Sequence, residues 1–446
     1  MIPRLVENLA STPKYAEIFS DASLLQAMLD FEAALARAEA SREVIPAGAA
    51  RGICNSAKAE GIHIGALGQQ GLRAGTLSIP LVKMLRERVG SVDKNAARFV
   101  HWGATSQDVS DTAMVLLLRR ARQVMSEDHA RLLKALRRAS DEHANTVMLG
   151  RTLLQAAPPV TLGLKIAGWF GALRRGWKRL DAAFADAMVL QFGGATGTLA
   201  ALGEKGSAVA SELAKNLDLA LPEAPWHAHR DRLAAVICDA GIYTGSLAKV
   251  ARDVSLLMQC EVAEVFEPGG NGRGGSSTMP HKRNPIACAL AIAAGDRVPG
   301  YVASFLSGMA QEHERGVGGW HAESATIART IEDTGLALVS MLEVSEGLKV
   351  DAAKMRRDIA DTRGVVFAER AMMKLSAALG RDAAETLLED ALRQTAESGT
   401  NLADALAEMP RVSSVLSGDE LRDLARPESY LGAAEIFRKQ LLATGD

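Results

Sequence analysis

Cysteine is scarce in this sequence, and its few cysteines stand far apart. No two of the four form a CxxC pair, so we expect neither a disulfide framework nor a thiolate metal site. Free thiols are typical of proteins in a reducing compartment. The four residues are Cys54, Cys238, Cys260 and Cys288.

A strong charge of one sign and a long uncharged run are also missing. The formal net charge is −2 at pH 7, which gives no global field for nucleic acid or an acidic membrane. No uncharged run reaches the roughly 18 residues of a membrane helix, and the segment up to Lys14 lacks the apolar core of a signal peptide. We expect a cytoplasmic protein without nucleic-acid or membrane partners, whose anionic ligands are held by local positive groups.

Proline is rare and bunched, which leaves room for very long helices because proline breaks the helical hydrogen-bond ladder. No sustained alternation of apolar and polar residues argues for a sheet of any size. The sequence therefore predicts an all-α fold. The proline-free spans are 81–157, 160–221, 226–267 and 300–409.

Apolar residues repeat at helical spacing over long stretches. Residues 23–40 form one amphipathic pattern, and from Asp111 onward a seven-residue repeat is typical of a bundle helix. Five long helices predict an elongated central bundle, and helices apolar on more than one face predict a homo-oligomer. The repeat is carried by Leu118, Met125, Leu132 and Ala139, with Leu136 between them; similar patterns cover about 160–190, 232–266, 286–310 and 323–349.

The length of the chain suits two or three domains with cores of their own. After about Val350 the helical patterns become shorter, and Gly380 interrupts them. We expect three helical domains: an N-terminal domain over 1–110, the central bundle and oligomerisation domain over 111–350, and a small C-terminal domain over 351–446.

The segment 268–285 combines many glycines with serine, lysine and arginine. Glycine lets backbone N–H groups crowd an anion, and Asn284 followed by Pro285 predicts a helix that starts at about Pro285. The positive end of that helix would face the loop, which suits carboxylate binding and activation of a serine. A flexible glycine-serine linker is the alternative, but the run Met-Pro-His-Lys-Arg-Asn-Pro from Met279 is not linker composition.

The same segment resembles the GSSxMPxKxNP signature of the fumarase/aspartase superfamily. The resemblance implies that Ser276 is the catalytic serine, with Ser277 as the adjacent alternative, and that Lys282 and Asn284 contact a substrate carboxylate. A serine becomes a base for a C–H proton only where N–H groups and a cation such as Lys282 stabilise its oxyanion. The resemblance also implies a tetramer in which three chains contribute to each site.

The segment His101–Asp108 resembles the HxGxTSxD segment of that superfamily. Thr105, Ser106 and Gln107 offer short donors beside a helix start, which suits a carboxylate. The resemblance implies that these three and His101 bind substrate. The alternative is an ordinary helix cap made by Asp108 or Ser110.

The segment from Gly150 to Pro158 is similar to the superfamily pattern GRTHxQ, although alone it is only a turn between helices. Arg151 and Thr152 match the pattern and are candidate substrate-binding residues. Leu153 stands where most members carry a histidine that assists departure of the leaving group. Leucine cannot transfer a proton, so the ordinary lyase reaction is in doubt.

Two further charged clusters are candidates. The cluster 226–232 contains Arg230, a candidate for substrate binding. His227 and His229 in the same cluster are two residues apart, so their side chains would point in different directions on a helix. We therefore expect no metal site there. The cluster 311–321 reads as a solvated turn or as part of a site. In it, Arg315 matches a substrate-region arginine of the related adenylosuccinate lyases.

From about residue 16 to at least residue 431 the chain resembles the carboxymuconate-lactonising cycloisomerases of the superfamily. That resemblance implies a tricarboxylate substrate, a carboxylate that adds within the molecule to a conjugated double bond, and no cofactor. The nucleophile is already ionised near pH 7, so one proton transfer at carbon remains and no second acid is needed. The alternatives are an adenylosuccinate- or argininosuccinate-type lyase and a catalytically silent relative.

Overall fold

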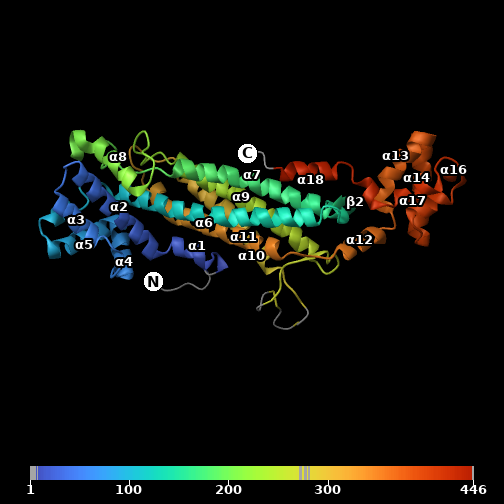
Figure 1. Cartoon of the computed structure of the whole chain (residues 1–446), viewed down its shortest axis with the longest axis horizontal. Coiled ribbons are helices and arrows are strands. Elements are labelled where there is room, and N and C mark those ends of the chain that lie inside the picture. Colours follow the sequence, from blue (N-terminus) through green and yellow to red (C-terminus); the bar gives the residue numbers. More distant parts are fainter. Residues whose placement is uncertain (1–6, 8, 271–273, 276–278, 280–281, 444–446) are drawn as a thin grey trace. The chain divides into compact units, whose positions relative to one another are not determined.

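The computed structural model is dominated by helices in the part of the chain that it describes, residues 7, 9–270, 274–275, 279 and 282–443. The all-α prediction is confirmed, and each long helix lies within a few residues of its predicted span at its N-terminal end. The long helices are α2 (Asp21–Ser41), α6 (Ser106–Glu142), α7 (Leu162–Ala187), α9 (Asp231–Leu257), α10 (Ile286–Ser307) and α11 (Gly319–Gly347) (Figure 1).

Shorter helices precede, separate and follow the long ones. In the first two thirds of the chain they are α1 (Pro13–Ile18), α3 (Ala47–Ser56), α4 (Ile64–Ala74), α5 (Ser78–Val92) and α8 (Gly206–Leu217). After β4 (Lys349–Val350) they are α12 (Ala352–Asp361), α13 (Ala368–Leu379), α14 (Arg381–Ser398), α15 (Leu402–Ala407), α16 (Pro410–Ser413), α17 (Gly418–Leu424) and α18 (Ala434–Leu442).

The chain forms two compact units, each assembled from three segments. Unit 1 comprises Met1–Ala130, Arg175–Lys249 and Leu290–Ser340, and unit 2 comprises Arg131–Arg174, Val250–Ala289 and Met341–Asp446. Each unit therefore contains part of every long helix from α6 onward. The division of the chain at residues 110 and 350 stays a prediction.

Within unit 1 the long helices pack through small residues and a few buried polar pairs. Thr244 of α9 and Thr334 of α11 pair their hydroxyls at 2.8 Å. A Cβ added to Gly295 of α10 would lie 2.5 Å from the Cβ of Ala248 in α9, so a glycine is required for this close approach. The predicted seam is confirmed here, because Leu118 and Met125 are fully buried. The packing of α6, α9, α10 and α11 therefore fixes the positions of the chain segments that lie at the ends of these helices.

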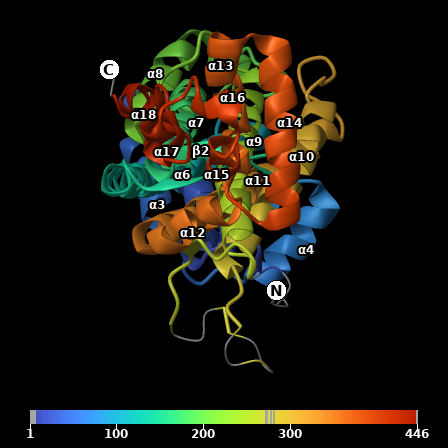
Figure 2. The same cartoon turned by 90° about the vertical axis from the view of Figure 1, so that its right-hand side faces the viewer.

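Unit 2 contains two small antiparallel sheets that the sequence did not indicate. Strand β1 (Val147–Thr152) pairs with β2 (Gln155–Thr161), and β3 (Val265–Phe266) pairs with β4. The short helices α13 to α17 surround a separate apolar core that includes Leu375, Leu388 and Leu406 (Figure 2).

Candidate active site

The predicted substrate-binding turn at the start of α6 lies against the arginine that precedes α11. Arg315 donates from Nη1 to the Thr105 hydroxyl at 2.7 Å, from Nη2 to the Ser106 hydroxyl at 3.3 Å and from Nε to the Gln107 side-chain oxygen at 3.3 Å. Among the described residues, no carboxylate forms an ion pair with Arg315. All three partners are neutral, so the guanidinium keeps its full charge for an anionic ligand.

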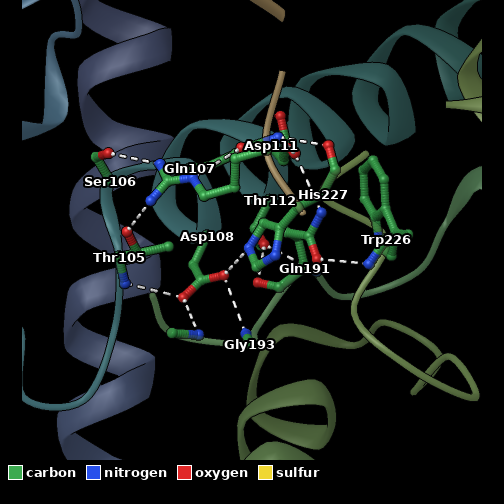
Figure 3. Close-up of polar contacts among 12 residues, drawn as sticks. Thr105, Ser106, Gln107, Asp108, Asp111, Thr112, Gln191, Gly193, Trp226 and His227 are labelled. Atoms are coloured by element: carbon green, nitrogen blue, oxygen red, sulfur yellow. Dashed lines mark hydrogen bonds and ion pairs between the residues drawn. The ribbon is translucent and has the colours of Figure 1, made fainter. Parts of the chain in front are cut away.

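Asp108 fixes the shape of this turn from inside the protein. Its fully buried carboxylate accepts hydrogen bonds from the backbone N–H groups of Thr105, Gly193 and Gly194 at 2.9 to 3.0 Å and from Nε2 of His227 at 2.7 Å (Figure 3). Asp108 is the third residue of α6, and its bond to the Thr105 N–H is half of a capping box. The helix-cap and binding-site interpretations of this segment are therefore compatible, since the cap orients the Thr105 side chain.

Arg230 is not placed to meet a substrate. Its side chain is 2 % exposed, and it donates both to Asp111, at 2.8 and 3.1 Å, and to Glu323, with a shortest distance of 2.6 Å. Its guanidinium also stacks on the ring of Trp226. Two buried carboxylates therefore already use the donors and the charge of Arg230, and its assignment to substrate binding stays a prediction that these contacts do not favour.

The buried triad of Arg230, Asp111 and Glu323 is supported by neutral donors. Trp320 donates from its indole N–H to Asp111 at 2.9 Å, and Gln311 donates to Glu323 at 2.6 Å. Burial alone would raise the pKa of Asp111, but Arg230 and these hydrogen bonds hold that pKa below its usual value. The triad anchors the segment 311–323, which carries Arg315.

Gln107 also serves the interior of the protein. The residue is 1 % exposed, and its amide nitrogen donates to the backbone oxygen of His227 at 2.8 Å and to Asp111 at 3.2 Å. Its oxygen accepts from Arg315, as described above. These contacts favour a residue that orients Arg315, while the assignment of Gln107 as a substrate ligand stays a prediction.

His101 lies at the other end of the same turn. Its Nδ1 is 2.6 Å from a carboxylate oxygen of the buried Glu32 in α2. Burial alone would lower the pKa of His101, but Glu32 raises it above the ordinary value for histidine. The contact with Glu32 therefore favours the protonated form of His101 on the segment predicted to bind substrate.

In unit 2, the predicted residues Arg151 and Thr152 lie on strand β1. Arg151 makes two hydrogen bonds of 2.9 Å to Glu264, whose side chain is fully buried. Burial raises the pKa of Glu264, Arg151 lowers it, and the neighbouring Asp358 raises it again, with a raised pKa as the result. Arg151 is thus paired with Glu264, which favours a support of the hairpin, while its assignment as a direct ligand stays a prediction.

The hairpin between β1 and β2 ends in two exposed leucines. Thr152 pairs with Gln155, so Leu153 and Leu154 form a two-residue turn, and both have positive φ, 51° and 65°. Type I′ turns need positive φ at both positions and favour Asn-Gly there. Leu153 is 97 % exposed and Leu154 is 74 % exposed. The position at which the GRTHxQ pattern has its histidine is thus an apolar side chain on the tip of a hairpin.

The predicted catalytic residues Ser276 and Ser277 lie outside the described residues. Next to them, Gly275 and Arg283 form an antiparallel bridge, and the backbone N–H of Asn284 donates to Gly274 at 2.8 Å. Lys282 is exposed and belongs to this returning segment.

Two backbone N–H groups in the first turn of the helix that follows this loop already have a partner within the protein. The carboxylate of Glu267 accepts from the backbone N–H groups of Ala287 and Cys288 in the first turn of α10, at 3.1 and 2.7 Å. These two amides are therefore occupied by the protein itself and do not face a ligand.

Several residues that build the site were not singled out as site residues from the sequence. They are Asp111, Gln191 and Glu323, and no local pattern in the sequence distinguishes them from other acidic or amide residues. Among the residues described, no group of three or more histidine, cysteine, aspartate or glutamate side chains is arranged to hold a metal.

Comparison with known proteins gives matches over nearly the whole chain. A family model described as lyase matches residues 8–300, and one described as the C-terminus of adenylosuccinate lyase matches residues 364–440. A 3-carboxy-cis,cis-muconate cycloisomerase of Pseudomonas aeruginosa is 50% identical over 426 residues, which are 96% of this chain and 93% of that protein.

A solved structure and a relative with a different reaction extend the comparison. The crystal structure of the 3-carboxy-cis,cis-muconate lactonizing enzyme from Pseudomonas putida has a TM-score of 0.94 at 45% identity and covers 99% of this chain and 98% of that chain. Nitrosuccinate lyase of Streptomyces davaonensis is 38% identical and covers 95% of this chain and 91% of that protein. Similar chains thus carry out more than one reaction.

Proposed function

The chain belongs to the fumarase/aspartase superfamily of lyases, and from this premise we infer that it is a cycloisomerase that closes 3-carboxy-cis,cis-muconate to 4-carboxymuconolactone. In this direction a C–O bond forms between one substrate carboxylate and a carbon of the conjugated double bond. A C–H bond forms at the carbon alpha to another carboxylate. No group leaves the substrate, so the only proton that moves is the one delivered to carbon.

The observation that carries the proposal is the apolar tip of the β1–β2 hairpin. A lyase that expels an amine or hydroxide needs a second proton donor for the leaving group. Leu153 offers an alkyl side chain at the position where the superfamily pattern has a histidine. In lactonisation the nucleophile is a carboxylate, ionised at neutral pH because its pKa is about 4, and a second acid has no task.

The proposed division of roles combines the superfamily resemblance with the contacts of the residues in unit 1 and of Arg151. Ser276 transfers the proton at carbon, with Ser277 as the alternative. Arg315, His101 and Lys282 offer positive charge to the three carboxylates of the substrate. Thr105, Ser106, Thr152 and Asn284 offer neutral hydrogen-bonding groups, while Gln107, Arg151 and Arg230 position their neighbours.

We also propose that the protein is a homotetramer in which active sites are shared between chains. Helices α9 and α10 are long and apolar enough, by length and composition, to cross a membrane, and only 28% of the apolar window of α10 is buried. In α10, however, Arg297 donates to Asp333 of α11 at 3.0 Å, and Ile286 and Leu306 are exposed. Apolar helix faces of this kind fit packing against a second copy of the chain. A cytoplasmic location and a role in bacterial protocatechuate catabolism are part of the same proposal.

The test is an ultraviolet assay with 3-carboxy-cis,cis-muconate, with adenylosuccinate and argininosuccinate in parallel. Lactonisation removes the conjugated diene, so we expect absorbance to fall with the muconate alone. Ser276→Ala should abolish the fall, while Ser277→Ala separates the two serines. Lys282→Met should lower turnover. Turnover of adenylosuccinate in place of the muconate would overturn the proposal.

A further inference from the structure

Helix α2 carries two buried glutamates that no step of the proposed reaction uses. Glu32 is 1 % exposed, and Glu39, seven residues later, is fully buried. A spacing of seven residues is close to two helical turns, so both side chains leave the same face of α2, about 10 Å apart along its axis. Buried carboxylates at this spacing need a cation or a proton, because an unpaired buried charge costs several kcal/mol.

The two glutamates differ in their partners. One oxygen of Glu32 contacts Nδ1 of His101 at 2.6 Å, while its other oxygen is buried without a hydrogen-bond partner. Both oxygens of Glu39 are buried without a partner among the described residues. Glu32 therefore has a cation to face, and Glu39 has none.

We propose that Glu32 is a positioning residue that holds His101 as an imidazolium cation beside the substrate-binding turn, while Glu39 stays neutral so that α2 presents a single negative charge to His101. This inference depends on the proposed function in one respect, which is the identity of the anionic substrate that His101 contacts. His101 has positive φ, 62°, a conformation that the surrounding structure must impose on a non-glycine residue. The contact with Glu32 fixes both the ring orientation and the charge of that residue.

Two other charged groups act on His101, and they act in opposite directions. Asp108 of α6 also favours the protonated ring, and Arg86 of α5 opposes it. The Asp108 carboxylate is already engaged by three backbone N–H groups and His227, as described above. Glu32 is the charged group in direct contact with the ring, so it decides whether His101 is a cation.

The function of this arrangement is to keep a positive charge constant over the pH range in which the enzyme works. An ordinary histidine loses its charge near pH 6.5, and the attraction for a tricarboxylate would fall with it. A neutral Glu39 adds no charge to this pair and needs no cation. Loss of the Glu32 charge should therefore move the pH dependence of substrate binding rather than abolish folding.

The experiment is a titration of the His101 ring by NMR in the full-length protein with isotope-labelled histidine, with the His101 signal identified from its absence in His101→Gln. In the wild type we expect a pKa above 6.5. Glu32→Gln keeps the side-chain shape and should lower the measured pKa by about one to three pH units. The pH above which kcat/KM declines should fall with it.

Glu39→Gln is the matched control, because it replaces a neutral acid by a neutral amide on the same helix face. It should leave both the His101 titration and the pH profile unchanged. A wild-type His101 pKa at or below 6.5, or a Glu32→Gln protein with an unchanged pKa, would overturn the proposal. So would a Glu39→Gln protein whose His101 pKa falls as far as in Glu32→Gln. The titration needs no substrate, so failure of the proposed reaction leaves its result readable.

Discussion

Arg315 and Thr105 are joined by a hydrogen bond of 2.7 Å across 210 residues of sequence. The bond connects the segment before α11 to the first turn of α6, two places that the sequence indicated separately as parts of a binding site. The partners of Arg315 are neutral, whereas Arg230, the residue before α9, is held by two carboxylates. The two arginines of unit 1 that were predicted to bind substrate therefore have different surroundings.

Replacement of Arg315 by methionine should damage substrate binding with little effect on stability. The guanidinium is half-buried and faces neutral partners, so its loss leaves no buried carboxylate unpaired. A hydrogen bond from a charged group contributes about 1.5–3 kcal/mol, so kcat/KM should fall roughly tenfold to a hundredfold. Steady-state kinetics and thermal melting measure the two effects. Arg98→Met, at an exposed arginine, is the control and should change neither.

Replacement of Arg230 by methionine should have the opposite effect, with a large loss of stability. It leaves Asp111 and Glu323 buried without their cation, and breaking such a pair costs about 3–5 kcal/mol of stability. Denaturant unfolding should show this loss. The triple variant that adds Asp111→Asn and Glu323→Gln should regain part of it. A stable Arg230→Met protein with a manyfold higher KM would restore Arg230 as a substrate ligand.

The long helices could be predicted from the sequence because their signal is repeated many times. Leu118, Met125 and Leu132 are fully buried, as their seven-residue spacing indicated. Pro285 lies just before α10, where it leaves the helical hydrogen-bond ladder intact. The apolar spacing and the proline position thus predict locally the same helices that the packing of the bundle requires.

The side-chain partners within the site could not be predicted in the same way. Arg230 and Arg315 are both arginines beside turns, and only their distant neighbours distinguish them. The partners of Arg230 are 119 and 93 residues away along the chain. Glu267 caps α10 from the segment before the glycine-rich loop, and no local pattern distinguishes it from a surface glutamate. Such pairings depend on the tertiary structure.

The pH dependence of stability should reveal the proton on Glu39. Burial, and after it the charge of Glu32, raises the pKa of Glu39 to about 9; in the unfolded chain the value is about 4.3. Between these values the folded chain holds a proton that the unfolded chain has released, so the free energy of unfolding falls as pH rises. This contribution is complete below about pH 4.3 and is lost by about pH 9.

Glu39→Gln should remove that pH dependence. The variant should match the wild type near pH 4 and exceed it by a few kcal/mol near pH 8.5. Denaturant unfolding at several pH values measures the difference. Glu17→Gln, at an exposed glutamate, is the control. A stability difference that does not change with pH would contradict a neutral Glu39.

Substitutions at the tip of the β1–β2 hairpin should be able to stabilise the protein. Leu153 and Leu154 both hold a left-handed conformation, which costs an L-residue about 1–2 kcal/mol, and Asn-Gly relieves most of this cost in a type I′ turn. The double replacement Leu153→Asn, Leu154→Gly should therefore raise the free energy of unfolding by about 1–2 kcal/mol, measured by denaturant unfolding.

Activity should move the other way, because two exposed leucines in a strained turn fit a tip that has a task beyond the stability of its own fold. If the tip meets substrate or a second copy of the chain, the double replacement should lower kcat/KM with 3-carboxy-cis,cis-muconate while the hairpin becomes more stable. Asp218→Gly is the matched control: Asp218 also has positive φ, 54°, at the end of α8, and relief there should raise stability without touching kinetics. A double variant that gains stability and keeps full activity would mean that the leucines are tolerated at the tip and not required there.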